Sequence, residues 1–472
     1  GMNLFKFFCP VLLGALVSCA GRSDWRKDAS NLIGEGRFSQ LDSVLEEAEP
    51  GASEQELRAI DSLREVMRRL RIEFCYNEGQ ILSRIRQRVS DTVSPEQIRR
   101  WEKSGRLEMR RIDGRKRYFS RSVGNLILLA PELEGLRRID SSEIGFRERH
   151  AARVIAATDS LGMCTNPVTM TIRYTLVVEP DAVPEGDTIR CWLPYPQEGL
   201  PRQTGVELIS AWPERYVVAP KGTPQRSICF EQPARRDSAT VFRLAFRVTT
   251  RAQYFDPEEL SKRVEPYDTL SEVYRKYTAQ RPPHLVFSER IERKARELAG
   301  GETDPVRIVS RIYDWIDDIP WAGAIEYGVI PNIPEYVLDA GHGDCGQVSL
   351  LLIAMLRSVG IPARWESGWM LHPGHVGLHD WGSVYYEGVG WVPLDISFGK
   401  LAASADPAVR DFYKTGMDSY RLVVNSDYGY PFDPPKRHMR SEPVDFQRGE
   451  AETSERNLYF DEWDYHMDVT YE

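Results

Sequence analysis

The most constraining feature of this sequence is the segment that follows Gly343. It begins Asp344-Cys345-Gly346-Gln347 and continues with apolar residues spaced three and four apart, as on one buried face of a helix: Val348, Leu351, Leu352, Met355 and Val359. Asp344 and Gln347 have the spacing of a capping box, and Gly360 and Pro362 supply a stop. We therefore expect a helix with Cys345 in its first turn, where the helix dipole and unpaired N–H groups favour a thiolate.

A nucleophilic thiolate needs a proton carrier, and the sequence offers an imidazole at His379. The stretch from His379 to Glu387 and the run from Trp391 to Ile396 are strand-like and flank a Gly388-Val389-Gly390 turn, which predicts a hairpin. Asp395 on the returning strand would lie beside His379 and hold its imidazole in one tautomer. The pattern leaves the register of the hairpin open.

The order Cys345, His379, Asp395 comes with three local motifs: Gly-Asp-Cys-Gly, His-x-Trp and Gly-Trp-Val-Pro-Leu-Asp. Together they resemble the transglutaminase-like superfamily, a circularly rearranged relative of the papain fold, over roughly residues 304–399. The resemblance implies that these three residues are catalytic, that no cofactor or metal is needed and that the substrate is a peptide or protein. A hydrolase (peptidase or amidase) is expected before a cross-linking transferase.

The resemblance also implies an oxyanion helper upstream of the cysteine, for which Trp321 and Tyr327 are the candidates. The spacing does not decide between them. Gln347, Trp381 and His375 are further candidates for the oxyanion site or the cleft, where His372 is also expected, in a loop at the rim.

Two other functions are compatible with the same residues. A non-catalytic protein that binds peptide or glycan would keep the fold without turnover. A zinc hydrolase would use the histidine-rich patch formed by His372, His375 and His379, with His342 and Asp380 nearby. However, Pro373, Gly374 and Gly377 interrupt this patch, so no helix places the imidazoles on one face.

The first residues predict export. A short charged segment precedes the apolar run Phe7 to Val17, which is too short to span a bilayer. Leu16-Val17-Ser18-Cys19 resembles the lipobox of bacterial lipoproteins, which implies a signal peptide over residues 1–18 and lipidation of Cys19. The protein would then be anchored to a membrane on the periplasmic or cell-surface side of the envelope. An ordinary signal peptide is the alternative, and it also leads to export.

The chain of 472 residues is long enough for several cores, and we expect a multidomain α+β protein. The expected parts are a helical domain with a small hairpin module (30–150), a β-sandwich (165–255), a helical connector (256–300), the papain- or transglutaminase-like domain (301–400) and a strand-containing extension (401–472). Cys75, Cys164, Cys191 and Cys229 could form disulfides after export, but no pairing is deducible.

Within the first of these parts, Ser94 to Leu107 and a hairpin around Asp113-Gly114 resemble a winged-helix or MerR-type DNA reader rich in arginine. The net charge of −9 and the expected export argue against a nucleic-acid partner. We therefore expect this module to serve packing or to bind an acidic polymer.

Overall fold

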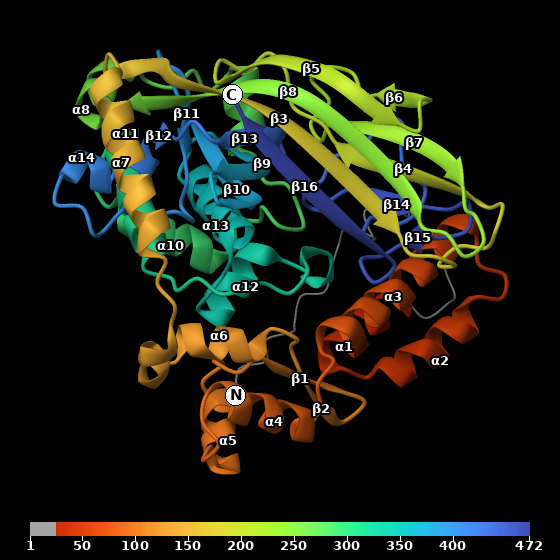
Figure 1. Ribbon diagram of the computed structural model, residues 1–472. Helices are drawn as coiled ribbons and strands as arrows, with labels where there is room; N and C mark the ends of the chain where they lie inside the picture. The colour runs from red at the N-terminus through yellow and green to blue at the C-terminus, as the bar shows by residue number, and fades with distance from the viewer. Residues whose placement is uncertain (1–24) are drawn as a thin grey trace. The chain divides into compact units, whose positions relative to one another are not determined.

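The computed structural model describes residues 25–472 and shows a mixed α+β architecture with N-terminal helices and several antiparallel sheets (Figure 1). The expected signal peptide and Cys19 lie outside the described residues. The chain divides into two compact units, which we describe separately. Unit 1 contains the described residues up to 139, with 280–286 and 318–351, and unit 2 contains 140–279, 287–317 and 352–472.

Unit 1 is mainly helical. Its elements are α1 (Trp25–Glu35), α2 (Phe38–Ala48), α3 (Glu54–Glu73), α4 (Glu78–Arg88), α5 (Pro95–Lys103), β1 (Met109–Ile112), β2 (Arg115–Tyr118), α6 (Ser122–Leu129), η1 (Pro131–Leu136), η2 (Tyr327–Val329), α12 (Ile333–Ala340) and the start of α13 (Cys345–Ser358). The apolar faces of α4, α5 and α6 form one core with Trp101 and Tyr118. Burial of these apolar faces stabilises helices that are too short to be stable in isolation.

The predicted helix-plus-hairpin module of unit 1 is confirmed. Ser94 caps α5 by accepting a hydrogen bond from the N–H of Gln97, and Pro95 occupies the first helical position. Strands β1 and β2 pair antiparallel with Ile112 opposite Arg115. Asp113 and Gly114 both have positive φ, 48° and 78°, as a two-residue hairpin turn requires.

Unit 2 combines sandwich sheets with a smaller sheet and its helices. Its elements are α7 (Ser141–Ala157), β3 (Leu161–Val178), β4 (Thr188–Pro194), β5 (Gln203–Trp212), β6 (Tyr216–Val218), β7 (Ser227–Pro233), β8 (Thr240–Phe255), α8 (Pro257–Arg263), α9 (Glu272–Thr278), α10 (Glu289–Ala299), α11 (Pro305–Asp317), the rest of α13, β9 (Ala363–His372), β10 (His375–Tyr386), β11 (Gly390–Leu394), α14 (Pro407–Arg410), η3 (Phe412–Lys414), β12 (Gly416–Met417), β13 (Arg421–Asn425), β14 (Glu450–Glu452), β15 (Asn457–Leu458) and β16 (Trp463–Tyr471).

The sandwich sheets are built from strands far apart in sequence. One has the order β12-β8-β3-β16, with β5 on β8, and the other has the order β15-β14-β4-β7-β6. Alternate residues of β3 and β8, such as Ile172 and Phe246, are fully buried in the core that these sheets share with Trp369 of β9. The sequence predicted a β-sandwich formed by residues 165–255 alone. In the structure, β14, β15 and β16 from the end of the chain complete its sheets.

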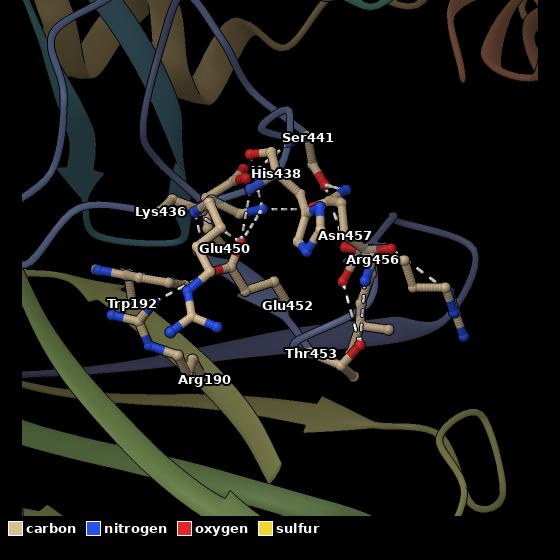
Figure 2. Close-up of polar contacts among 12 residues, drawn as sticks. Arg190, Trp192, Lys436, His438, Ser441, Glu450, Glu452, Thr453, Arg456 and Asn457 are labelled. Atoms are coloured by element: carbon tan, nitrogen blue, oxygen red, sulfur yellow. Dashed lines mark hydrogen bonds and ion pairs between the residues drawn. The ribbon is translucent and has the colours of Figure 1, made fainter. Parts of the chain in front are cut away.

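Buried ion pairs fix the β14–β15 hairpin to the sandwich (Figure 2). Glu452 is fully buried, and its carboxylate lies 3.1 Å from Arg190 of β4 and 3.2 Å from Lys436. Lys436 also donates to the amide oxygen of Asn457, at 2.5 Å. Glu450 accepts hydrogen bonds from the N–H groups of Ser441 and Glu442, at 2.7 and 2.9 Å. Both buried carboxylates, Glu450 and Glu452, therefore have polar partners. These partners offset the cost of removing the charges from water.

The smaller sheet has the order β11-β10-β9-β13. Its strand β13 comes from the extension over 401–472 that was expected to contain a strand, and it pairs with β9. The predicted hairpin is also present, but β10 begins at His375, four residues earlier than expected, and the loop is Glu387 to Val389. The turn between β9 and β10 is only Pro373-Gly374, because Gly374 adopts a positive φ of 80°.

All five cysteines of residues 25–472 are free thiols, so the pairing considered for Cys75, Cys164, Cys191 and Cys229 does not occur there. Across the same residues, no helix is both long enough and apolar enough to cross a bilayer.

Candidate active site

Cys345 is the first residue of α13, as its sequence context predicts. The capping box is confirmed: the N–H of Gln347 donates to Asp344 Oδ1 and the N–H of Asp344 donates to Gln347 Oε1, both at 3.1 Å. The Tyr327 hydroxyl donates to the same Asp344 oxygen at 2.5 Å. Cys345 is half-buried, and its position at the helix start exposes it to the positive end of the dipole.

The approach to Cys345 is fixed by two glycines of unit 1. Gly341 ends α12 in the left-handed conformation, with φ 72°, which reverses the chain. At Gly343 a Cβ would lie 3.1 Å from Val337 and 3.3 Å from Gln347, tighter than ordinary contacts. The backbone of Gly343 also pairs with the segment after Pro320, donating to the Pro320 carbonyl and accepting from the N–H of Ala322. Side chains larger than hydrogen at position 343 would displace the start of α13.

The neighbouring segment is held by α6. The Asn125 amide makes two hydrogen bonds to Gly323, donating to its carbonyl at 2.8 Å and accepting from its N–H at 2.9 Å. The Arg121 guanidinium donates to the carbonyl of Ala324. Because Ala322 of this segment pairs with Gly343, α6 supports the residues just before Cys345 indirectly, through the segment after Pro320. Sequence reasoning gave α6 no role at the cysteine.

His379 and Asp395 are in direct contact in unit 2. The imidazole Nε2 lies 2.8 Å from Asp395 Oδ2, and both residues are buried. Asp395 is not on the returning strand as expected, because β11 ends at Leu394. Its other carboxylate oxygen accepts from the N–H groups of Ser397 and Phe398, a turn that ends the strand. With Nε2 engaged, Nδ1 is the ring nitrogen left for proton transfer.

Arg421 adds a charge that the sequence did not suggest. Its guanidinium lies 2.7 Å from Asp395 Oδ2 and 3.0 Å from Asp418 Oδ2, and all three side chains are fully buried. Burial opposes ionisation of Asp395, but the charges of His379 and Arg421 outweigh it and hold the pKa of this carboxyl well below its usual value. Burial also lowers the pKa of His379, against the attraction of Asp395. The pair is therefore set as a carboxylate and a neutral imidazole near pH 7.

Comparison with known proteins finds the same region. Residues 292–396 match the family model of the transglutaminase-like superfamily, and this range includes Cys345, His379 and Asp395. The chain contains a transglutaminase-like domain. No curated protein is similar enough to this chain to match it.

Three solved structures resemble parts of the chain. A candidate cysteine protease from Cytophaga hutchinsonii has 14% identity and a TM-score of 0.44, over 66% of this chain and 93% of its own. The periplasmic domain of TgpA from Pseudomonas aeruginosa has 14% identity and a TM-score of 0.27, over 49% and 88%. A candidate protease from Parabacteroides distasonis has 16% identity and a TM-score of 0.21, over 53% and 49%. At these values, no activity is transferred from them to this chain.

The residues expected to line the cleft occupy different environments. Trp381 is fully buried and donates its indole N–H to Glu366 at 2.9 Å, so it packs the sheet of the transglutaminase-like domain instead of lining an open surface. Gln347 is also fully buried in its capping box. Trp321 is 52% exposed, beside the Gly343 backbone. Tyr327 bonds Asp344, and His375 is half-buried within 3.3 Å of Asp140.

The histidines proposed as zinc ligands are each paired with carboxylates, and His372 and His375 both lie near Glu143, at 2.7 and 3.9 Å. His372 is buried at the end of β9, 2.7 Å from Glu143 and 3.2 Å from Asp418, and does not lie in an exposed rim loop. His375 contacts Asp140, and His379 contacts Asp395. Within residues 25–472, no three histidine, cysteine, aspartate or glutamate side chains converge as metal ligands. The zinc hypothesis is therefore not supported by the arrangement of its own residues.

Carboxyl groups with raised pKa values gather in unit 1 near Asp344. Burial raises the pKa of Glu73 to about 8, with a further contribution from the charge of Glu326. Burial also raises the pKa of Glu108 to about 7, although the Tyr336 hydroxyl donates to it at 2.7 Å. Asp344 reaches about 6 for the same reason. These acids bind protons more tightly in the folded chain than in the unfolded chain.

The replacement Glu108→Gln should stabilise unit 1 at high pH. A carboxyl group whose pKa is raised by folding stabilises the folded chain fully at pH values below its unfolded pKa of about 4.5. This stabilisation is lost as the pH rises through the folded pKa of about 7. We expect no difference between variant and wild type near pH 4.5 and an advantage of about 1–3 kcal/mol for the variant at pH 8. Hydrogen exchange of buried α6 amides measures it. Replacement of the exposed Glu134 by Gln should not change how the stability depends on pH. If it has the same effect as Glu108→Gln, the pH dependence does not come from buried Glu108.

Proposed function

We propose that this protein is a thiol enzyme that cleaves amide bonds through an acyl-cysteine intermediate. The observation that carries this proposal is the buried contact between His379 Nε2 and Asp395 Oδ2, at 2.8 Å, within a domain that matches the transglutaminase-like superfamily and contains a helix-start cysteine. Each of the three groups is of the chemical type that its role requires.

The proposed reaction has two stages. Nδ1 of the neutral His379 takes the proton of the Cys345 thiol, and the resulting thiolate attacks the amide carbon. The imidazolium then returns that proton to the amine nitrogen as the C–N bond breaks, which leaves the acyl-cysteine. Asp395 keeps Nε2 protonated and so directs Nδ1 toward the reaction. Water, deprotonated by the now neutral Nδ1, then attacks the acyl carbon and releases the acid and the thiolate. A lysine amine in place of water would give a cross-link, and we favour water because no residue of the site excludes it.

The substrate class that fits the proposal is a peptide or protein. We further propose that the protein is exported and anchored through Cys19, which rests on the lipobox-like Leu16-Val17-Ser18-Cys19 sequence. This placement would bring the enzyme to peptides of the cell envelope or the surroundings of the cell.

Alkylation by iodoacetamide tests the thiolate directly, because Cys75 of the same chain is an exposed free cysteine and serves as an internal reference. We expect Cys345 to react faster than Cys75 below pH 8, and His379→Ala to slow Cys345 alone. Peptide mass spectrometry measures both rates in one sample. If Cys345 reacts no faster than Cys75 and ignores His379→Ala, the chain is a non-catalytic binding protein.

A further inference from the structure

The helix-plus-hairpin module of unit 1 carries a basic surface that the proposed reaction does not use. Between residues 110 and 117 the hairpin contains five cations and one acid, in a chain whose net charge is −9. The acid, Asp113, is occupied: its carboxylate accepts from the N–H and hydroxyl of Ser39 at 2.9 and 2.8 Å. Lys116 is also occupied, by Glu102 at 2.9 Å.

Two arginines of β2 remain without a counterion. Arg115 is exposed and Arg117 is half-buried, and in the described part of the chain neither lies within ion-pair distance of a carboxylate. They share one face of β2, because side chains two residues apart point the same way. Guanidinium groups in this arrangement present paired N–H donors that match a carboxylate.

These arginines line a hollow at the start of α4. A pocket of about 680 Å³ is lined by Arg71, Asn77, Gln80, Arg115 and Arg117, among others. A second pocket, of about 520 Å³, shares Asn77, Arg115 and Arg117 with it. Each hollow also has one acid in its lining, Asp113 in the larger and Glu78 in the smaller, and Glu78 lies 3.6 Å from Lys116. Asn77 is the N-cap of α4, so the positive end of an eleven-residue helix dipole faces the same space. We call these two hollows, which share three lining residues, the arginine pocket.

The form of the arginine pocket favours a peptide over other anions. The larger hollow, of about 680 Å³, accommodates several residues of a chain, whereas a single inorganic ion would occupy a small part of it. Strand β2 belongs to a two-stranded sheet, so one of its edges has no neighbouring strand. In the described structure this outer edge is paired only at Tyr118, which forms a bridge with Tyr76. An open strand edge pairs with peptide backbone, which glycans and nucleic acids lack. The one aromatic ring in the lining, Phe74, is buried and offers no stacking surface for bases.

We propose that the arginine pocket binds an acidic segment of a peptide. The choice of a peptide rests on the proposed amide-cleaving function, for which this pocket would act as a second substrate contact outside the catalytic residues. Glutamate or aspartate side chains of the ligand pair with Arg115 and Arg117, and the ligand backbone runs along the edge of β2.

The test uses the full chain carrying Cys345→Ala, so that binding is measured without turnover. A fluorescein-labelled glutamate-rich peptide is titrated by anisotropy against its glutamine counterpart. We expect the glutamate peptide to bind at least about tenfold more tightly, with affinity falling as salt rises. The double variant Arg115→Ala/Arg117→Ala should raise its Kd about tenfold.

A matched control separates a pocket from general attraction. Arg99→Ala/Lys103→Ala removes the same charge from exposed positions of α5 that do not line the pocket. We expect this control to change the Kd little. The proposal is overturned if both double variants weaken binding equally, if the glutamine peptide binds as well, or if a single-stranded oligonucleotide or heparin binds more tightly than the glutamate peptide. Because the readout is binding, a failed alkylation test and a failed pocket test remain distinguishable.

Discussion

Replacing Cys345 with alanine should reduce peptide cleavage by about four orders of magnitude or more, because the acyl intermediate then has no atom on which to form. The measurement is the kcat/KM for the best substrates selected from a fluorogenic peptide library. The start of α13 should survive the change, since the capping box of Asp344 and Gln347 does not use the cysteine side chain. Unchanged hydrogen exchange in α13 would show that the fold is intact.

Cys164→Ala is the matched control for this experiment. Cys164 is a half-buried free thiol of β3, and burial raises its pKa, which makes it a poor nucleophile. We expect its replacement to leave cleavage unchanged, and a metal chelator to leave the wild type unchanged as well. Retained cleavage in the Cys345 variant would refute the thiol mechanism, whereas parallel losses in both variants would indicate damage to the fold.

The second large effect concerns stability. Arg421→Met should lower the free energy of unfolding of unit 2 by about 3–5 kcal/mol, since it leaves Asp395 and Asp418 buried without their common cation. Methionine keeps much of the apolar volume, so the loss reports mainly the uncompensated charges. Thermal unfolding and hydrogen exchange of β9 and β13 amides measure it.

The comparison for this variant is Arg247→Met. Arg247 makes an ion pair with Glu472 at 2.6 Å, but both side chains are more than 40% exposed. Water replaces the lost partner there, and we expect little change in stability. Equal effects of the two replacements would mean that the buried network contributes nothing beyond an ordinary surface pair. Lower pH should also rescue the Arg421 variant in part, because protonation removes the unpaired charges on Asp395 and Asp418.

Local sequence patterns predicted the parts of the site that depend on neighbouring residues. The capping box needs only Asp344, Gln347 and the apolar period that follows, and all of these lie within a few turns. The hairpin of β10 and β11 is local in the same way, and its register places Gly382 opposite Leu394, one residue before Asp395. The end of β11 was misplaced because the turn at Asp395 is made by backbone N–H groups that donate to its side chain, and hydrophobic periodicity does not report such bonds.

The parts that sequence patterns missed depend on distant pairings. Arg421 reaches Asp395 because β13 pairs with β9, with Arg421 opposite Met370, and nothing near position 421 indicates that partner. His372 was assigned to an exposed loop because Pro373 and Gly374 follow it, yet those residues form a tight turn and the imidazole is buried between Glu143 and Asp418. Strand β16 is mostly exposed, so its weak alternation gave little sign of a sheet.

That strand has a consequence for how the protein is made. Because β16 pairs with the second half of β3, and β14 pairs with β4, the sandwich lacks β12, β14, β15 and β16 until the chain well beyond Cys345 has been synthesised. Closure of the sandwich therefore waits for strands that are synthesised long after β3 and β4. Until those strands are made, β3 and β4 each have an unpaired edge, which is prone to pair with other chains.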